Sequence, residues 1–399
     1  MPGLATRMSR AVPSAIMAVA EKAKALKAQG RDIISFSIGV PNFLPGEHVY
    51  AAAHQALDRD SGNYGSNRGP DGLLDAFLAH FKRNGFDGFE RKNLCVGVGA
   101  KHVIFNVMYA ILEEGDELIL PAPYWTSHID IARILGADIK VAYCGSEQDY
   151  KLTAAQLESL ISPRTKLLVL NNPGNPTGMV YTEAEIRALG DVLSKHPHVW
   201  ILSDDIYNQM IFDGLGWHHL LKTHPHLRDR VILLDSLSKT YGMPGWRVGV
   251  AAAPVELAQA LVTLNSNHIT NLPEVVCAAA IAALTGPQDI PQKMAGEFMA
   301  KRDEVMATFA RIQGLSCPRP QGAFYAFPDV SFAFGKRHGA ASITDDVDFC
   351  NVLLDAKGVA CVPGSAFGEP KALRISYTCK AQELTEGLKR FEEFCSELH

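Results

Sequence analysis

The sequence lacks the surplus of positive charge that a nucleic-acid-binding protein needs. Its 399 residues include 38 Lys and Arg against 43 Asp and Glu, which gives a formal net charge of -5. Proteins that bind a phosphate backbone displace its counterions with clustered Lys and Arg side chains. We therefore expect no nucleic-acid partner.

Closely spaced cysteines and long apolar runs are missing as well. The eight cysteines are scattered, with no CxxC pair and no His/Cys cluster of zinc-ligand spacing, so we expect no metal site and assign most of them to the core. The first 22 residues include Arg7, Arg10, Glu21 and Lys22. They form neither the apolar core of a signal peptide nor a membrane span of about 20 apolar residues. These absences favour a reduced, cytoplasmic protein that does not contact a membrane.

What the sequence does contain is a repeated unit in which a short apolar run ends in small or polar residues and a helical stretch follows. Runs this rich in β-branched and aliphatic residues are typical of strands buried on both faces. Alternation with helices predicts an α/β fold with a mostly parallel central sheet. The runs are Leu94–Val98, Glu117–Leu120, Lys166–Leu170, Val199–Leu202, Val231–Leu234 and Arg247–Ala252.

The length of the chain suggests two domains. Residues 14–29 have apolar side chains at helical spacing, and Gly30 can end that helix. After Pro287 the pattern changes to a long polar helix at 292–312, a short run at 322–327 and a closing helix. We predict a large domain at 48–287 and a small domain at 288–399, which the N-terminal segment 1–47 joins.

A lysine with neighbouring phosphate-binding groups follows the run Val231–Leu234. Ligands of open α/β sheets gather beyond the carboxyl ends of the strands. Here Lys239 comes after the hydroxyls of Ser236 and Ser238 and precedes Arg247 by eight positions. A partly buried lysine near other cations becomes a nucleophile, and the hydroxyls and the arginine could hold a phosphate beside it. The alternative is a lysine in an ordinary surface loop.

Two further strand ends carry groups suited to a protonated aromatic ring. Asp204 follows Val199–Leu202, and a buried carboxylate there needs a cation, such as a protonated pyridine nitrogen. Tyr207 could reach the adjacent ring oxygen. Asn175 lies in a turn that prolines and glycines make rigid, so its amide is well placed as a hydrogen-bond donor. Taken singly, the aspartate could be a helix cap and the turn a surface loop.

Small residues follow the run Leu94–Val98. Gly99, Ala100 and Lys101 open a helix, where free backbone N–H groups can bind an anion. Trp125, after Glu117–Leu120, could stack on a planar ring, although a single tryptophan is more often part of the core. Neither the Rossmann glycine pattern nor a P-loop occurs, so nucleotide binding is not indicated.

Together these segments resemble the class I aminotransferases of pyridoxal-phosphate (PLP) fold type I, and the bacterial aspartate-type subgroup above all. The resemblance rests on Asn-Pro-Thr-Gly at 175–178, Ser-Asp-Asp-Ile-Tyr at 203–207 and Ser-Leu-Ser-Lys with Gly-Trp-Arg-Val-Gly within 236–249, and it extends over nearly the whole chain. It implies a PLP-binding large domain, a smaller α+β domain and a homodimer with shared active sites. The implied activity moves an amino group from an amino acid of aspartate or glutamate type to a 2-oxo acid by a ping-pong mechanism.

The resemblance also implies a role for each candidate residue. Lys239 would hold the cofactor covalently and move the substrate α-proton, Asp204 would pair with the ring nitrogen, and Tyr207 and Asn175 would bind the ring oxygen. Arg374 would bind the substrate α-carboxylate with help from the backbone of Gly39. The remaining roles are phosphate binding by Gly99, Ala100, Ser236, Ser238 and Arg247, ring stacking by Trp125, recognition of a distal carboxylate by Lys101, and contact with the neighbouring subunit's phosphate by Tyr64.

Two departures from the family pattern leave the substrate open. The usual Gly-Glu-Pro-Asp-Phe reads Gly-Val-Pro-Asn-Phe at 39–43, and Ile16 stands where aspartate-type members tend to have a small hydroxyl residue. An aromatic or aliphatic amino-acid substrate therefore stays open beside aspartate and glutamate. So does a PLP-dependent β-lyase on the same fold. A PLP-binding regulator is disfavoured because Lys239 and Arg374 are both present.

Overall fold

Most of the candidate residues lie at or next to the ends of strands in a seven-stranded sheet. The computed structural model describes residues 3–59 and 62–399, so the first two residues of the predicted 1–47 segment lie outside the described part. All neighbouring strands run parallel except β8, which is antiparallel to both of its neighbours. The α/β fold with a mostly parallel sheet is therefore confirmed. In order across the sheet the strands are β2 (Leu94–Val98), β8 (Val248–Ala252), β7 (Val231–Ser236), β6 (Trp200–Asp204), β5 (Thr165–Asn171), β3 (Glu117–Ala122) and β4 (Asp138–Tyr143).

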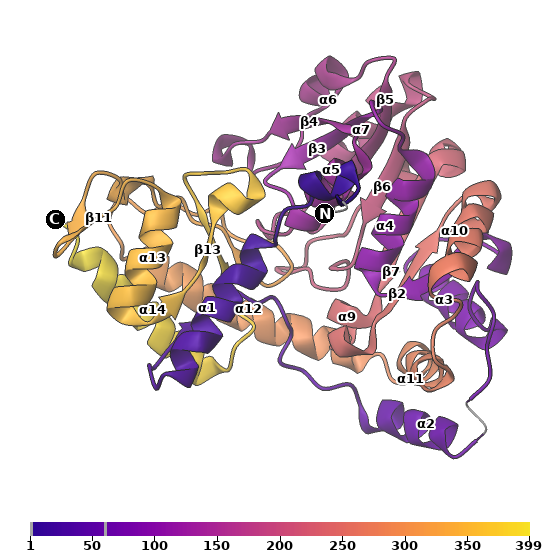
Figure 1. Cartoon of the computed structure of the whole chain (residues 1–399), viewed down its shortest axis with the longest axis horizontal. Coiled ribbons are helices and arrows are strands. Elements are labelled where there is room, and N and C mark those ends of the chain that lie inside the picture. The colour runs from indigo at the N-terminus through magenta and orange to yellow at the C-terminus, as the bar shows by residue number, and fades with distance from the viewer. Residues whose placement is uncertain (1–2, 60–61) are drawn as a thin grey trace.

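Helices cover both faces of this sheet (Figure 1). One face packs against α4 (Ala100–Ile111), α5 (Thr126–Leu135) and α10 (Val255–His268). The other packs against α6 (Ala154–Leu160), α7 (Glu183–Lys195) and α8 (Leu220–Thr223). The central strands β6 and β7 are consequently buried along almost their whole length, which explains the apolar runs Val199–Leu202 and Val231–Leu234.

A second core lies at the β2 edge of the sheet. There α2 (Glu47–Leu57), α3 (Asp71–Arg83) and α11 (Glu274–Thr285) pack on one another and on β2 and β8. Figure 1 shows α2 and α11 side by side below this edge. This packing brings α3 close to the end of β7.

The other part of the molecule is a smaller α+β unit, which lies on the left in Figure 1. Its sheet has the order β13 (Val362–Pro363), β14 (Leu373–Ser376), β9 (Tyr325–Ala326), and all its pairs are antiparallel. The chain's first strand, β1 (Ile34–Ser35), pairs in parallel with β12 (Val359–Ala360), and a short hairpin joins β10 (Arg337–His338) to β11 (Ala341–Ser342). The helices are α1 (Ala15–Ala28), α12 (Asp289–Phe309), α13 (Asp346–Lys357) and α14 (Ala381–Ser396).

Short helical turns connect these elements. Helix α9 (Leu237–Thr240) directly follows β7. The 3-10 turns span Thr6–Arg10, Arg91–Asn93, Ser146–Gln148, Pro225–Arg230, Pro244–Trp246, Ser331–Ala333 and Gly364–Phe367.

Two other features bear on the sequence expectations. Within residues 3–59 and 62–399, no helix is long and apolar enough to cross a membrane. Six of the eight cysteines are buried, as expected of core residues, and each cysteine is a free thiol. The domain boundaries at 47 and 287 and the cytoplasmic location stay predictions.

Candidate active site

One cavity of about 140 Å³ is lined by seven of the fourteen candidate residues. It opens at the carboxyl ends of β5, β6 and β7, where parallel strands bring their following loops together. The smaller unit closes it from the other side with β9 and β14. Among the residues that line it are Gly39, Trp125, Asn175, Asp204, Tyr207, Lys239 and Arg374, all predicted from the sequence.

Lys239 lies on α9, directly beyond the end of β7. Its Nζ donates a hydrogen bond to the backbone carbonyl of Gly39, at 2.6 Å. Burial lowers the pKa of Lys239 to about 8, and the nearby cations Arg374 and Arg247 act in the same direction. A substantial fraction of this amine is therefore neutral near pH 8, and a neutral amine is a nucleophile and a base.

Asp204 ends β6 and is only 1% exposed. Its Oδ2 lies 3.1 Å from Nε2 of His128, whereas its buried Oδ1 has no hydrogen-bond partner. A buried carboxylate is costly unless cations or donors surround it. The free Oδ1 thus leaves room for one more donor on the cavity side.

The neighbouring Asp205 has different surroundings. Its Oδ2 lies 3.3 Å from His219 Nε2, and its Oδ1 accepts a hydrogen bond from the hydroxyl of Ser203. Asp205 is not one of the residues that line the cavity. Burial raises its pKa. Of the two adjacent aspartates, only Asp204 can meet a ligand in the cavity.

Arg374, on β14, is buried and holds a fixed position. Its Nη1 donates to Asn175 Oδ1 at 3.1 Å, and its Nη2 donates to the carbonyl of Ser37 at 2.5 Å. The guanidinium lies 4.8 Å from the ring centre of Tyr325 and 5.0 Å from that of Phe367. Its Nε has no partner. A planar cation held in this way is suited to bind a carboxylate through two parallel hydrogen bonds.

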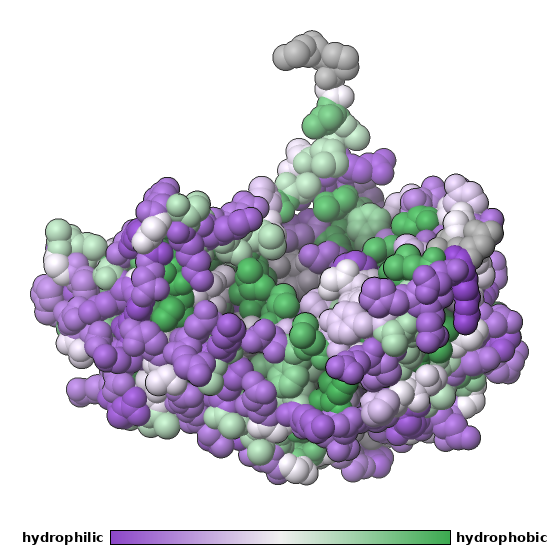
Figure 2. Space-filling model, turned by 90° about the horizontal axis from the view of Figure 1, so that it is seen from below, coloured by the Kyte–Doolittle hydropathy of each residue, from purple (hydrophilic) through white to green (hydrophobic). Residues whose placement is uncertain are grey.

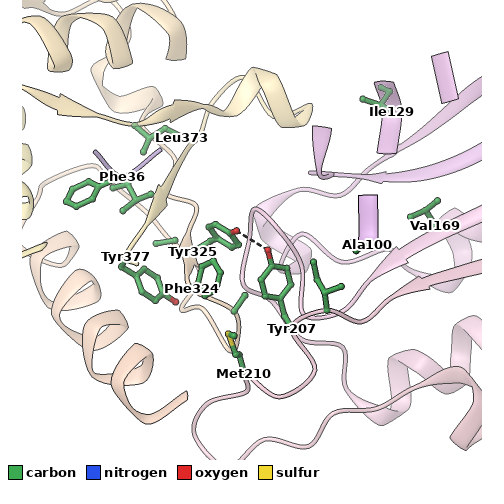
Figure 3. Packing of buried hydrophobic residues seen from close by; sticks show 14 of the residues in the cluster. Phe36, Ala100, Ile129, Val169, Tyr207, Met210, Phe324, Tyr325, Leu373 and Tyr377 are labelled. Atoms are coloured by element: carbon green, nitrogen blue, oxygen red, sulfur yellow. Dashed lines mark hydrogen bonds between the residues drawn. The ribbon is translucent and has the colours of Figure 1, made fainter. Parts of the chain in front are cut away.

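Two tyrosine hydroxyls meet beside the arginine. Figure 3 shows Tyr207, from the loop after β6, and Tyr325, from β9, pointing toward one another. Their oxygens are 2.9 Å apart, and Tyr207 also packs edge-on against Phe324, with ring centres 5.4 Å apart. Burial raises the pKa of both phenols, so they stay protonated and can donate hydrogen bonds.

The predicted phosphate-binding residues lie around the junction of β2, β8 and α9. Gly99 caps α4 with a φ of 80°, and a Cβ there would lie 2.4 Å from Nη2 of Arg247. Arg247 donates to the carbonyls of Pro244 and Val98, at 3.0 and 3.3 Å. Ala100 begins α4, and Ser236 caps α9 by accepting the N–H of Ser238. The antiparallel pairing of β2 with β8 places Gly99 and Arg247 together.

Of three other predicted residues, one lines the cavity, one lies next to it and one lies outside it. Trp125 lines it and stands edge-on against His128, with ring centres 5.2 Å apart. The Nζ of Lys101 lies 5.1 Å from the centre of the Trp125 ring. Tyr64 is 89% exposed and is not among the lining residues, so within one chain it does not reach the site.

Sequence reasoning missed two residues that hold the site together. His128 pairs with Asp204, and its only sequence signal is its position in the first turn of α5, three residues after the N-cap residue Trp125. Tyr325 pairs with Tyr207 and stacks on Arg374. It belongs to the apolar run at 322–327, in which nothing local sets it apart from its neighbours.

Comparison with known proteins gives one consistent result. The family model described as aminotransferase class I and II matches residues 31–391. The aspartate/prephenate aminotransferase of Cereibacter sphaeroides is 40% identical over 399 residues, which is 100% of both chains. The aspartate aminotransferase of Rhizobium meliloti is 38% identical, and the alignment covers 99% of this chain and 96% of the relative.

Solved structures of aspartate aminotransferases also match this chain. A crystal structure of the Rhizobium meliloti aspartate aminotransferase superposes with a TM-score of 0.96 at 38% identity and covers 100% of both chains. The Thermus thermophilus aspartate aminotransferase with maleate has a TM-score of 0.91 at 31% identity, and the match covers 99% of this chain and 100% of that one.

Proposed function

Because the chain belongs to the class I and II aminotransferase family and is a PLP-dependent aminotransferase, we propose that the cavity between β5–β7 and β14 is its active site, with Lys239 as the cofactor-binding residue. The enzyme transfers an amino group from an amino acid to a 2-oxo acid. The observation that best supports the site is a partly buried lysine of lowered pKa in the same cavity as a buried aspartate oxygen without a partner.

The residues around the cavity fit PLP. Asp204 would hold a proton on the ring nitrogen with its free Oδ1, and Tyr207 and Asn175 would bind the ring oxygen. Trp125 would stack on the ring. The phosphate would be held by the backbone at Gly99 and Ala100, the hydroxyls of Ser236 and Ser238, and Arg247.

The chain's own residues have separate roles in the reaction. When bound, PLP stabilises the negative charge that develops on the substrate α-carbon. The Lys239 amine, with its pKa of about 8, can take up a proton near neutral pH and return it, as a general base and acid must. Arg374 binds the α-carboxylate and so fixes the α-carbon beside that amine. His128 keeps the Asp204 carboxylate oriented by donating to Oδ2.

For the substrate we propose aspartate as amino donor. The support is the names of the relatives, one of which acts on aspartate and prephenate, and the cation of Lys101 beside Trp125 at the rim of the site. Ile16, Met17 and Ile38 also line the cavity, and this apolar wall favours an amino acid with an apolar side chain as a second substrate.

Half-reactions test the proposal directly. Each of aspartate, glutamate and phenylalanine is mixed with the cofactor-loaded enzyme without an acceptor, and the cofactor absorbance is followed. We expect aspartate to react fastest. Borohydride reduction followed by peptide mapping should place the cofactor on Lys239. A label on another lysine contradicts the site, and rapid reaction with phenylalanine alone contradicts the donor assignment.

We also propose that the enzyme is a homodimer with shared sites. Large apolar side chains on the N-terminal 44 residues are exposed, and Figure 2 shows apolar residues on the projecting N-terminal segment. Apolar surface of this kind is typical of a protein–protein interface. Tyr64, exposed in one chain, would then reach the partner's phosphate site. The exposed residues are Leu4, Met8, Val12, Met17, Ile38, Val40 and Leu44.

A further inference from the structure

A third buried histidine–aspartate pair lies beneath the cofactor-binding turn, after His128–Asp204 and His219–Asp205. His80, on α3, is 5% exposed, and Asp235, near the end of β7, is 2% exposed. His80 Nε2 lies 2.9 Å from Asp235 Oδ2. Because a carboxylate only accepts hydrogen bonds, Nε2 carries a proton and donates it. Asn84 Nδ2 lies 3.1 Å from the same ring nitrogen, but both groups are donors, so Asp235 is the acceptor for the His80 proton. His80 itself does not line the active-site cavity.

Asp235 connects this histidine to the turn that carries Lys239. Its Oδ1 accepts the backbone N–H of Ser236 at 2.6 Å, and its Oδ2 also accepts a hydrogen bond from Asn208 Nδ2 at 3.1 Å. Ser236 in turn caps α9, since its Oγ accepts the N–H of Ser238 at 3.3 Å. An unbroken series of hydrogen bonds therefore runs from α3 to the first turn of α9.

The orientation of Asp235 depends on His80. A buried carboxylate that loses a donor is strongly destabilised, and it either rotates toward another donor or takes up a proton. Either response weakens the bond from Oδ1 to the N–H of Ser236. The start of α9 would then lose its anchor, and the hydroxyls of Ser236 and Ser238 would move together with Lys239.

We propose that His80 is a positioning residue for the cofactor: through Asp235 it fixes the turn 236–239, on which the phosphate-binding hydroxyls and Lys239 lie. This inference rests on the proposed function, because it takes those residues to be the cofactor's ligands. His80 would act on cofactor affinity without touching the cofactor or the substrate.

The test compares three variants with the parent. His80→Leu removes the donor at similar volume, and His80→Gln retains it, because the glutamine amide nitrogen can occupy the place of Nε2. Phe77→Leu, on the same helix and equally buried, lowers stability without touching Asp235. The affinity of each cofactor-free protein for PLP is measured by titration, and stability by urea unfolding.

We expect His80→Leu to bind PLP at least about tenfold more weakly, the loss typical of one charge-assisted hydrogen bond. His80→Gln should recover most of the affinity, and Phe77→Leu should keep the parent's value. Equal affinity in His80→Leu and the parent, or the same loss in Phe77→Leu, overturns the proposal. Should His80→Leu fail to fold, His80→Asn, whose shorter amide cannot reach Asp235, replaces it in the comparison with His80→Gln.

The same titration separates this inference from the function on which it rests. If the parent attaches no PLP to Lys239 after borohydride reduction, the proposed site is wrong. If the parent does so and the His80 variants match it in affinity, only the role of His80 is wrong.

Discussion

At the scale of single residues, the lowered pKa of Lys239 predicts how the stability of the folded chain depends on pH. Its pKa is lowered from 10.5 to about 8, so below pH 8 the folded chain must protonate a buried amine. The unfolded chain keeps that proton up to about pH 10.4. The protonated amine therefore lowers the free energy of unfolding by about 3 kcal/mol below pH 8. This penalty shrinks as the pH rises from 8 to 10.4, so stability increases through that window.

Lys239→Met should accordingly abolish transamination yet stabilise the cofactor-free chain at pH 7. The gain in unfolding free energy, measured in urea, should shrink as the pH approaches 10.4. Lys24→Met, at an exposed position on α1, serves as the control and should show no such change. A gain that stays constant with pH would mean that the substituted side chain only adds apolar packing.

Asp204→Asn tests the role of the free carboxylate oxygen. The amide has the same shape but cannot keep a ring nitrogen protonated, so we expect the cofactor to bind and kcat to fall by about 100-fold or more. Absorbance of the bound cofactor and steady-state kinetics measure the two effects. Turnover like the parent's would assign another role to Asp204.

Arg374→Lys should be far from conservative, because an ammonium cannot reproduce two parallel hydrogen bonds to a carboxylate. We expect kcat/KM to fall by roughly 10- to 100-fold for every amino acid, since all share the α-carboxylate. Lys101→Ala should impair only dicarboxylic substrates. The two variants are compared on aspartate and on a monocarboxylic amino acid that the parent accepts. Normal reaction of Arg374→Lys with both would contradict the assignment.

How far the sequence identifies the site depends on where each residue's partners lie. Lys239, Asp204 and Asn175 follow apolar runs, and the edge of a parallel sheet brings such positions together. His128 and Tyr325 act through side chains 76 and 118 residues away in the chain. Contacts between residues that distant are set by packing, which no local pattern encodes.

At the scale of elements, the sequence predicts buried strands well and edge strands poorly. The six predicted runs all form strands, with ends within two residues of those expected. The edge strand β4 was not predicted, because five of its six residues are exposed or only partly buried and its sequence lacks a continuous apolar run. β8 runs antiparallel, and strand direction likewise depends on the connections rather than on the run itself.

The turn between β2 and α4 gives a prediction at this scale. Gly99→Ala places a methyl group at a φ of 80°, where L-residues are strained by about 1–2 kcal/mol, and pushes the guanidinium of Arg247 away. We expect lower stability and weaker PLP binding. Gly115→Ala has a φ of 90° but no atom within 4 Å of the new methyl group. This control should lose a similar amount of stability, measured by urea unfolding, and keep its affinity for PLP. If both variants bind PLP equally well, the backbone at Gly99 does not hold the phosphate.

At the scale of the whole molecule, the N-terminal region is divided between the two parts of the chain. β1 pairs with β12, and α1 lies beside that strand. Thr6–Arg10 instead lies against α5 of the large sheet, where Arg10 forms an ion pair with Glu114. Composition gave no sign of this division, because it depends on which surface each short segment meets.

The exposed side chains of this N-terminal region also predict the oligomeric state. The exposed side chains of Leu4, Met8 and Val12 would leave apolar surface in water in a monomer, and burial in a dimer would remove it. We expect sedimentation equilibrium to give twice the chain mass of 43.4 kDa. Replacing these three residues by Ser should weaken the dimer and, because Tyr64 then leaves the partner's site, should make PLP affinity fall on dilution. Tyr143→Ser, an equally exposed aromatic on the edge strand β4, should change neither property. A parent that sediments as a monomer at micromolar concentration while it binds PLP fully would contradict shared sites.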